Sequence, residues 1–134
     1  MPHTADVGFR AWGTDLADLF ETAARAMFGL EYDVDAVPQQ ESPSVAVQGD
    51  DLEGTLYAWL SELLWLHDAE GFALSDVWVD PVGADLSVRG VAIGAPIGDW
   101  FQQVGPQLKA VTMHGLEVVH RPGDGYEATV YLDV

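Results

Sequence analysis

The period of the hydrophobic pattern changes along this chain, and the order of the changes limits the folds available to it. Residues 7–12 and 45–47 have the two-residue period of strands, and each is followed by the 3.6-residue period of a helix, over 14–28 and 52–68. Beyond Gly71 the two-residue period dominates. The sequence therefore predicts an α+β fold, a two-layer sandwich with two helices packed on one mixed β-sheet.

The first predicted helix has a clear beginning and end. Thr14 is expected to cap it, and Gly29 is expected to end it. Its apolar residues share one face: Leu16, Leu19, Phe20, Ala23 and Met27. We expect that face to lie on the sheet.

The second predicted helix carries one tryptophan away from its apolar stripe. The stripe consists of Leu52, Leu56, Trp59, Leu60 and Leu63. At about 100° per residue, Trp65 points roughly 170° from the centre of that stripe. Two interpretations remain open: the ring is covered by a loop or half exposed, or it is an anchor for a partner protein.

The second half of the chain is read as strands. Pro81 and Gly83 are expected to turn a hairpin, and an irregular stretch follows from 94 to 107. The closing strands are predicted at 110–112, 116–119 and 126–132. The last turn is Arg121-Pro-Gly-Asp-Gly.

Length and composition indicate one domain that folds without cross-links. The chain has 134 residues, of which 49% are hydrophobic, and no cysteine. We expect a single domain over 1–134 and a cytoplasmic location. The longest apolar region, near Trp59–Leu66, is interrupted by Ser61 and Glu62, so no membrane span is expected.

The charge of the chain argues against direct contact with nucleic acid. Asp and Glu number 22 against 5 Lys and Arg, which gives a net charge of −17. Nucleic-acid affinity depends on cationic side chains that displace counterions, so direct RNA or DNA binding is not expected. The imbalance suits a metal cation or a basic protein surface, and it is also typical of a salt-adapted, soluble protein.

Oxygen ligands for a hard metal ion gather near the two ends of the sequence. Asp6 follows His3 just before the first predicted strand, and the last strand ends with Asp133 and the α-carboxylate of Val134. If Asp6 lies on an adjacent strand, three oxygen donors of the kind that Ca²⁺ or Mg²⁺ prefers come together. The alternatives are a turn cap at Asp6, a disordered His3 and a solvated acidic terminus.

Lys109 and His114 form the third candidate. Lys109 is the only lysine, and His114 stands near an expected strand bend. His114 is either a functional base or a structural histidine, and no partners can be identified for His67 or His120. No nucleophile elbow, His-Glu-x-x-His motif or phosphate-binding glycine loop is found, so no catalytic residue is predicted.

Taken together, these segments resemble the archease family. The resemblance rests on four segments in order: His3-Thr4-Ala5-Asp6-Val7-Gly8, Asp51-Leu52 through Trp59-Leu60-Ser61-Glu62-Leu63-Leu64, Lys109-Ala110-Val111-Thr112-Met113-His114, and Leu132-Asp133-Val134. It covers nearly the whole chain. One departure is Ala95, which stands where the family usually has glutamate in a Gly-Glu-Pro segment.

The resemblance implies a function and a metal site. Archeases are small acidic accessory proteins of the GTP-dependent RNA ligase that joins a 2′,3′-cyclic phosphate or 3′-phosphate end to a 5′-hydroxyl in tRNA splicing and RNA repair. The resemblance implies that such a protein promotes guanylylation of the ligase and its repeated turnover. It also implies a divalent cation, Ca²⁺ or Mg²⁺, bound by Asp6, Asp133 and Val134.

Three function classes are therefore compared. The first is the ligase activator, and the second is a chaperone or specificity factor for an RNA-modifying enzyme such as a tRNA methyltransferase. The third, a small metal-dependent hydrolase, is disfavoured because no nucleophile is paired with a base in the sequence.

Overall fold

The computed structural model describes residues 6–134, which form two helices, six strands and one 3-10 turn. In chain order these are β1 (Asp6–Gly13), α1 (Leu16–Gly29), η1 (Val34–Ala36), β2 (Ser44–Gln48), α2 (Leu52–Glu70), β3 (Phe72–Val79), β4 (Ser87–Pro96), β5 (Ala110–Arg121) and β6 (Gly125–Asp133). The predicted α+β class is confirmed.

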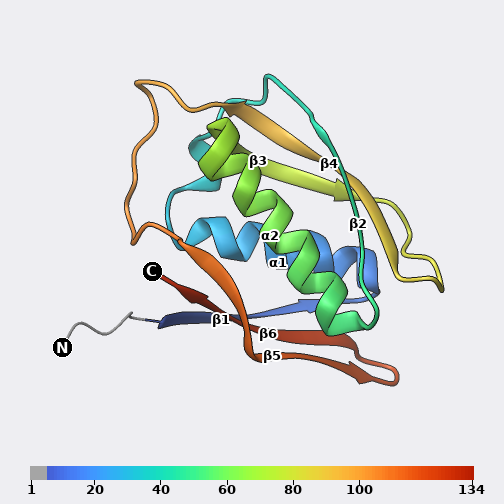
Figure 1. Cartoon of the computed structure of the whole chain (residues 1–134). Coiled ribbons are helices and arrows are strands. Elements are labelled where there is room, and N and C mark those ends of the chain that lie inside the picture. Colours follow the sequence, from blue (N-terminus) through green and yellow to red (C-terminus); the bar gives the residue numbers. More distant parts are fainter. Residues whose placement is uncertain (1–5) are drawn as a thin grey trace.

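The strands form two separate sheets, so the prediction of one mixed sheet is wrong. One sheet has the order β1-β6-β5 and the other β2-β4-β3, and every pairing is antiparallel. Both helices lie between the two sheets (Figure 1), which makes three layers instead of the predicted two. Hydrophobic period identifies strands but carries no information about which strands pair, because pairing joins segments far apart in sequence.

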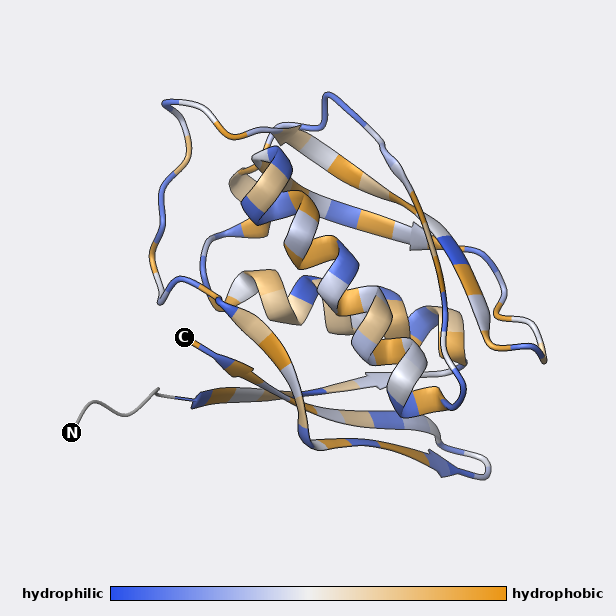
Figure 2. Ribbon diagram, viewed as in Figure 1, coloured by the Kyte–Doolittle hydropathy of each residue, from blue (hydrophilic) through white to orange (hydrophobic). Residues whose placement is uncertain are grey.

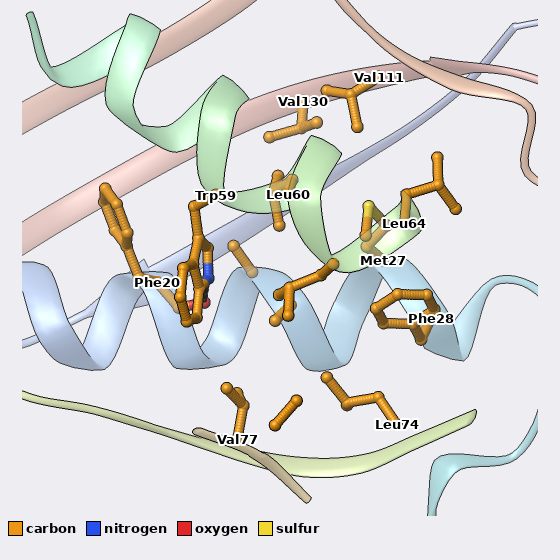
Figure 3. Packing of buried hydrophobic residues seen from close by; sticks show 14 of the residues in the cluster. Phe20, Met27, Phe28, Trp59, Leu60, Leu64, Leu74, Val77, Val111 and Val130 are labelled. Carbon is orange, nitrogen blue, oxygen red and sulfur yellow. Dashed lines mark hydrogen bonds between the residues drawn. The ribbon is translucent and has the colours of Figure 1, made fainter. Parts of the chain in front are cut away.

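The helices can fill a middle layer because their buried residues face both sheets. Figure 3 shows Val111 and Val130 of one sheet on one side of the helices and Leu74 and Val77 of the other sheet on the opposite side. Fully buried aromatic side chains occupy the space between them, Trp59 among them. In Figure 2 apolar and polar residues alternate along strands such as β4, as expected for strands with one buried face.

The cap of α1 is Asp15 and not the predicted Thr14. The Asp15 side chain accepts a hydrogen bond from the backbone N–H of Asp18. The Asp18 carboxylate in turn accepts from the backbone N–H of Thr14 at 2.8 Å. Thr14 is therefore part of a reciprocal capping arrangement, one residue outside the cap itself.

The end of α2 depends on a glycine in the left-handed region. Gly71 has φ 65° and ψ 38°, and its N–H donates to the carbonyl of Leu66. The helix runs two residues beyond the predicted end at Asp68 because Gly71 supplies the stop.

β5 is one long strand where two short ones were predicted. The register against β6 shifts between Thr112 and Glu117, and Gly115 within this bulge has φ 76°. The bulge interrupts the alternation of apolar residues, which is why the sequence reads as two strands. Ala95, the departure from the family pattern, is fully buried inside β4 opposite Ala73.

Within residues 6–134, no helix is long and apolar enough to cross a membrane.

Candidate functional site

Asp6 and Asp133 lie directly opposite each other on neighbouring strands. They are register partners in the antiparallel pair of β1 and β6, at the end of the sheet where the chain terminates (Figure 1). Side chains of directly opposed residues project from the same face with Cβ atoms about 4.5 to 5.5 Å apart. Asp6 is exposed and Asp133 half-buried, so the pair faces solvent on the side of the sheet away from the helices.

A hollow of about 540 Å³ contains this pair. Three strands contribute its lining: Asp6 and Gly8 from β1, Thr112 and His114 from β5, and Tyr131 and Asp133 from β6. The backbone N–H of His114 donates to the Thr112 hydroxyl oxygen at 3.1 Å, which shapes the bulge at this rim. The structure thus brings His114 to the same hollow as the two carboxylates.

Tyr131 forms a fixed wall of the hollow because two glycines make room for its ring. A Cβ atom on Gly8 would lie 2.7 Å from Cδ1 and Cε1 of Tyr131, and one on Gly115 would lie 2.9 Å from Cδ2 and Cε2. The ring therefore spans the space between β1 and β5, with one edge against each glycine. Gly8 is the last residue of the first segment that carried the resemblance, and Gly115 directly follows the third, so both segments lie against this ring.

Gly8→Ala is expected to displace the Tyr131 ring and lower the free energy of unfolding by about 1 to 3 kcal/mol, because the added methyl group overlaps the ring edge. In a Tyr131→Ala background the same change should cost little. Urea unfolding of both single variants and the double variant measures this coupling. Gly29→Ala is the control, since its Cβ meets nothing within 4 Å. Equal cost of Gly8→Ala in both backgrounds would contradict the packing argument.

The other predicted site residues lie elsewhere. His3 is outside the described residues. Lys109 is exposed and borders a second hollow together with Trp65, not the hollow of the carboxylate pair. Trp65 is half exposed, so a covering loop is ruled out as its explanation. Val134 directly follows Asp133, and its side chain packs on the core.

The donor set at the carboxylate pair fits a hard cation. Within residues 6–134, neither Asp6 nor Asp133 has a salt-bridge partner or a hydrogen-bond donor to its side chain. No group of three or more His, Cys, Asp or Glu side chains suited to a metal occurs in that range, so these side chains alone do not complete a metal site, and the carboxylate of Val134 stays the third ligand that the sequence analysis expected. Carboxylate oxygens without nitrogen or sulfur suit Ca²⁺ or Mg²⁺.

A buried ion pair was missed by the sequence reading. Glu31 and His67 are 2% and 6% exposed, and Glu31 Oε2 lies 2.7 Å from His67 Nε2. Glu31 Oε1 also accepts from the backbone N–H of Leu108 at 2.9 Å, just before the Lys109–His114 segment. The second ring nitrogen of His67 faces the carbonyl of Phe72 at 3.0 Å. Because both nitrogens face oxygen acceptors, the contacts favour the doubly protonated, cationic ring.

The pKa values of this pair follow from their contacts. Burial alone would raise the pKa of Glu31, but hydrogen bonds from His67 and Leu108 outweigh it and lower that pKa from 4.5. Burial alone would lower the pKa of His67, but the bond and charge of Glu31 outweigh it and raise that pKa from 6.5. Each partner therefore holds the other in its charged form.

Tyr131 was also missed, although the sequence contained a signal for it. Because side chains alternate between the two faces of a strand, Tyr131 lies on the same face as Asp133, which follows it by two positions. No local signal identified Glu31, because it lies between Gly29 and Pro38 in a segment that reads as a loop.

Comparison with known proteins assigns the family. The model of the archease protein family (MTH1598/TM1083) matches residues 1–134. The chain belongs to the archease family. It is 37% identical to protein archease of Archaeoglobus fulgidus over 139 residues, covering 100% of this chain and 96% of that protein. It is 38% identical to protein archease of Methanothermobacter thermautotrophicus over 133 residues, covering 98% and 94%.

A solved structure also matches the fold. The solution structure of Methanobacterium thermoautotrophicum protein 1598 superposes with a TM-score of 0.80 at 34% identity, covering 100% of this chain and 96% of that one. In the present chain, the segments that carried the resemblance meet in space although they are far apart in sequence. Register pairs join Asp6 to Asp133 and Asp133 to Ala110, so three of the four segments adjoin at one sheet end.

Proposed function

We propose that this chain is a metal-binding accessory protein that activates the GTP-dependent RNA ligase, promoting its guanylylation and repeated turnover. The cation, Ca²⁺ or Mg²⁺, is held by Asp6, Asp133 and the carboxylate of Val134. The observation that carries the proposal is the opposed pair Asp6 and Asp133 on β1 and β6. The ligase itself comes from the archease resemblance.

Electrostatics favours a cation at this position. Two carboxylates directly opposite on adjacent strands repel each other, which destabilises the pairing unless a positive charge lies between them. Within the described chain the salt bridges formed by arginine are at Asp76 and Glu127, and none reaches Asp6 or Asp133. A divalent cation would remove the repulsion and satisfy the oxygens together.

The charge distribution also favours a basic partner. The ligase must bind GTP and RNA phosphates, and such clefts are rich in cationic side chains. A protein with a net charge of −17 would be steered toward that cleft, and raising the salt concentration should weaken the pairing. Asp6 and Asp133 would position the cation there, where it could supply charge to phosphate oxygens during guanylylation.

An Asp6→Ala, Asp133→Ala double variant is expected to lose Ca²⁺ binding in calorimetry and to slow ligase guanylylation under multiple turnover. The variant should fold, because both side chains face solvent and contribute little to the core. Glu117→Ala is the control, an exposed acid on the same sheet outside this hollow.

Two results would contradict the proposal. Unchanged Ca²⁺ affinity in the double variant would place the metal elsewhere. If the double variant loses Ca²⁺ binding but the ligase guanylylation rate is unchanged, the metal does not act in ligase activation. If capture from native cytoplasm recovers a tRNA methyltransferase and no ligase, the role is that of a specificity factor for that enzyme.

A further inference from the structure

Trp65 differs from two other exposed tryptophans in having no partner for its ring nitrogen. The indole N–H of Trp12 donates to Glu127 Oε2 at 2.9 Å, and that of Trp78 donates to Asp80 Oδ1 at 3.2 Å. No acceptor for the Trp65 N–H and no aromatic neighbour occurs among residues 6–134, although Trp65 is 51% exposed. Its donor and its ring are therefore accessible to another molecule.

Trp65 borders two hollows that are lined in part by apolar side chains. The first, of about 320 Å³, is lined by Leu66 and Phe72 among others, and the second, of about 240 Å³, by Leu64 and Val111 among others. Trp65 lines both of them. An exposed aromatic side chain that borders two small hollows can serve as an interface anchor, since anchors carry most of the binding energy when neighbouring contacts exclude water.

The charge around Trp65 selects the kind of partner. Glu41 and Glu70 line the first hollow, and Asp68 and Lys109 line the second, so three of the four charged lining residues are acidic. A guanidinium or ammonium group can lie on the face of a tryptophan while donating to adjacent carboxylates. The surface thus combines the two chemical features that recognise a basic side chain.

We propose that the Trp65 surface binds a basic segment of a partner protein, with an arginine or lysine side chain over the indole ring and apolar side chains in the two hollows. A second copy of this chain is a poor occupant, because two molecules of net charge −17 repel each other. The proposal deepens the proposed function and rests on it for the partner, the RNA ligase.

The position of the surface allows one partner to cover it and the carboxylate pair together. Ala110 and Val111 at the start of β5 line the second hollow, and Ala110 is the register partner of Asp133. The two regions lie on opposite faces of the sheet and meet at its edge strand β5, around which one partner would have to extend. Trp65 would add affinity at this junction, while Asp6 and Asp133 would act at the nucleotide.

The ligase affinity of Trp65→Ala tests the proposal, measured by calorimetry against wild type and Trp78→Ala. Trp78 is 59% exposed and lines a different hollow, on β3 and its neighbours, so it is a matched control. We expect Trp65→Ala to bind the ligase about tenfold or more weakly and Trp78→Ala to bind normally. Glu70→Gln should also weaken ligase binding, and the difference in affinity between this variant and wild type should become smaller as salt is added.

A peptide probe tests the surface without the ligase. The five indole N–H signals of the ¹⁵N-labelled protein would be assigned by Trp→Phe variants and followed during titration with acetyl-Leu-Arg-Leu-Arg-amide at low salt. We expect a saturable shift of the Trp65 signal, with Trp12 and Trp78 unmoved. The same peptide with citrulline in place of arginine keeps the shape without the charge and should cause no shift.

Failure of this inference and failure of the proposed function can be told apart. Wild-type affinity of Trp65→Ala for the ligase overturns the inference and leaves ligase activation intact. If wild type does not bind the ligase, the proposed function fails, and the peptide decides the surface: a selective Trp65 shift supports it, and no shift or equal shifts overturn it. A Trp65 shift that depends on protein concentration alone would identify a second copy as the occupant and overturn the inference.

Discussion

Glu31→Ala is expected to lower the free energy of unfolding by about 3 to 5 kcal/mol, because it leaves a buried charge without its partner. The removed carboxylate accepts hydrogen bonds from His67 at 2.7 Å and from the backbone of Leu108 at 2.9 Å, and His67 is itself buried. The backbone carbonyl of Glu31, which accepts from Val104 and Gly105, would remain. Urea unfolding of the variant measures the loss.

The contribution of this ion pair should also depend on pH in a defined window. The pKa of Glu31 is lowered from 4.5, so its contribution is present above that value and is lost as the pH falls through the lowered pKa. The pKa of His67 is raised from 6.5, so its contribution is present below that value and is lost as the pH rises through the raised pKa. The pair therefore stabilises most between pH 4.5 and 6.5.

Glu31→Gln is the control that separates charge from packing. Glutamine keeps the volume and can still accept from Leu108, while His67 can become neutral and accept from the amide. We expect a smaller loss than for Glu31→Ala. The stability difference between wild type and Glu31→Gln should shrink as the pH rises through the raised pKa of His67. A difference that is constant with pH would show that the pair is not ionised in the fold.

Trp59→Ala is expected to cost about 3 to 5 kcal/mol, because Trp59 is fully buried in the middle layer and connects three elements. It projects from α2, its indole N–H donates to the carbonyl of Phe20 on α1 at 3.2 Å, and its Cη2 would lie 3.0 Å from a Cβ on Gly90 of β4. Figure 3 shows Trp59 extending from α2 to α1, with its ring beside Phe20.

Two substitutions calibrate this loss in urea unfolding. Trp59→Phe keeps an apolar ring in the core and should cost clearly less than Trp59→Ala. The Phe20 carbonyl loses the indole donor in this variant but keeps the backbone hydrogen bond that a carbonyl within a helix accepts. Trp78→Ala removes an exposed ring and should change stability by no more than about 0.5 kcal/mol. Similar losses for Trp59→Ala and Trp78→Ala would show that the middle layer does not depend on Trp59.

The sequence predicted the individual elements because their signals are local. The period of apolar residues located both helices, and the helical angle correctly placed Trp65 away from the stripe. Strand pairing could not be read in this way, and one mixed sheet was predicted where two occur. A split into two sheets depends on helices that bury residues on opposite sides, which requires knowing where both sheets lie.

The same distinction explains the residues of the candidate site. Asp6, Asp133 and His114 were identified as candidates, and the structure adds that they line one hollow. Glu31 and His67 were not linked, because a buried charge is recognisable only through its partner, and nothing in the sequence near either residue indicates the other. Long-range pairs of this kind are visible only after the fold is known.

The pairing of β1 with β6 has a consequence for how the protein folds during synthesis. β1 has its partner in β6, more than a hundred residues later, so the sheet that holds Asp6 and Asp133 cannot form until residues 125–133 have been synthesised. Closing so long a loop costs chain entropy and slows folding relative to local contacts. On the ribosome, β2, β3 and β4 with the helices can assemble first, and the carboxylate pair forms in the final step. A nascent chain that still lacks β6 would therefore have no opposed carboxylate pair.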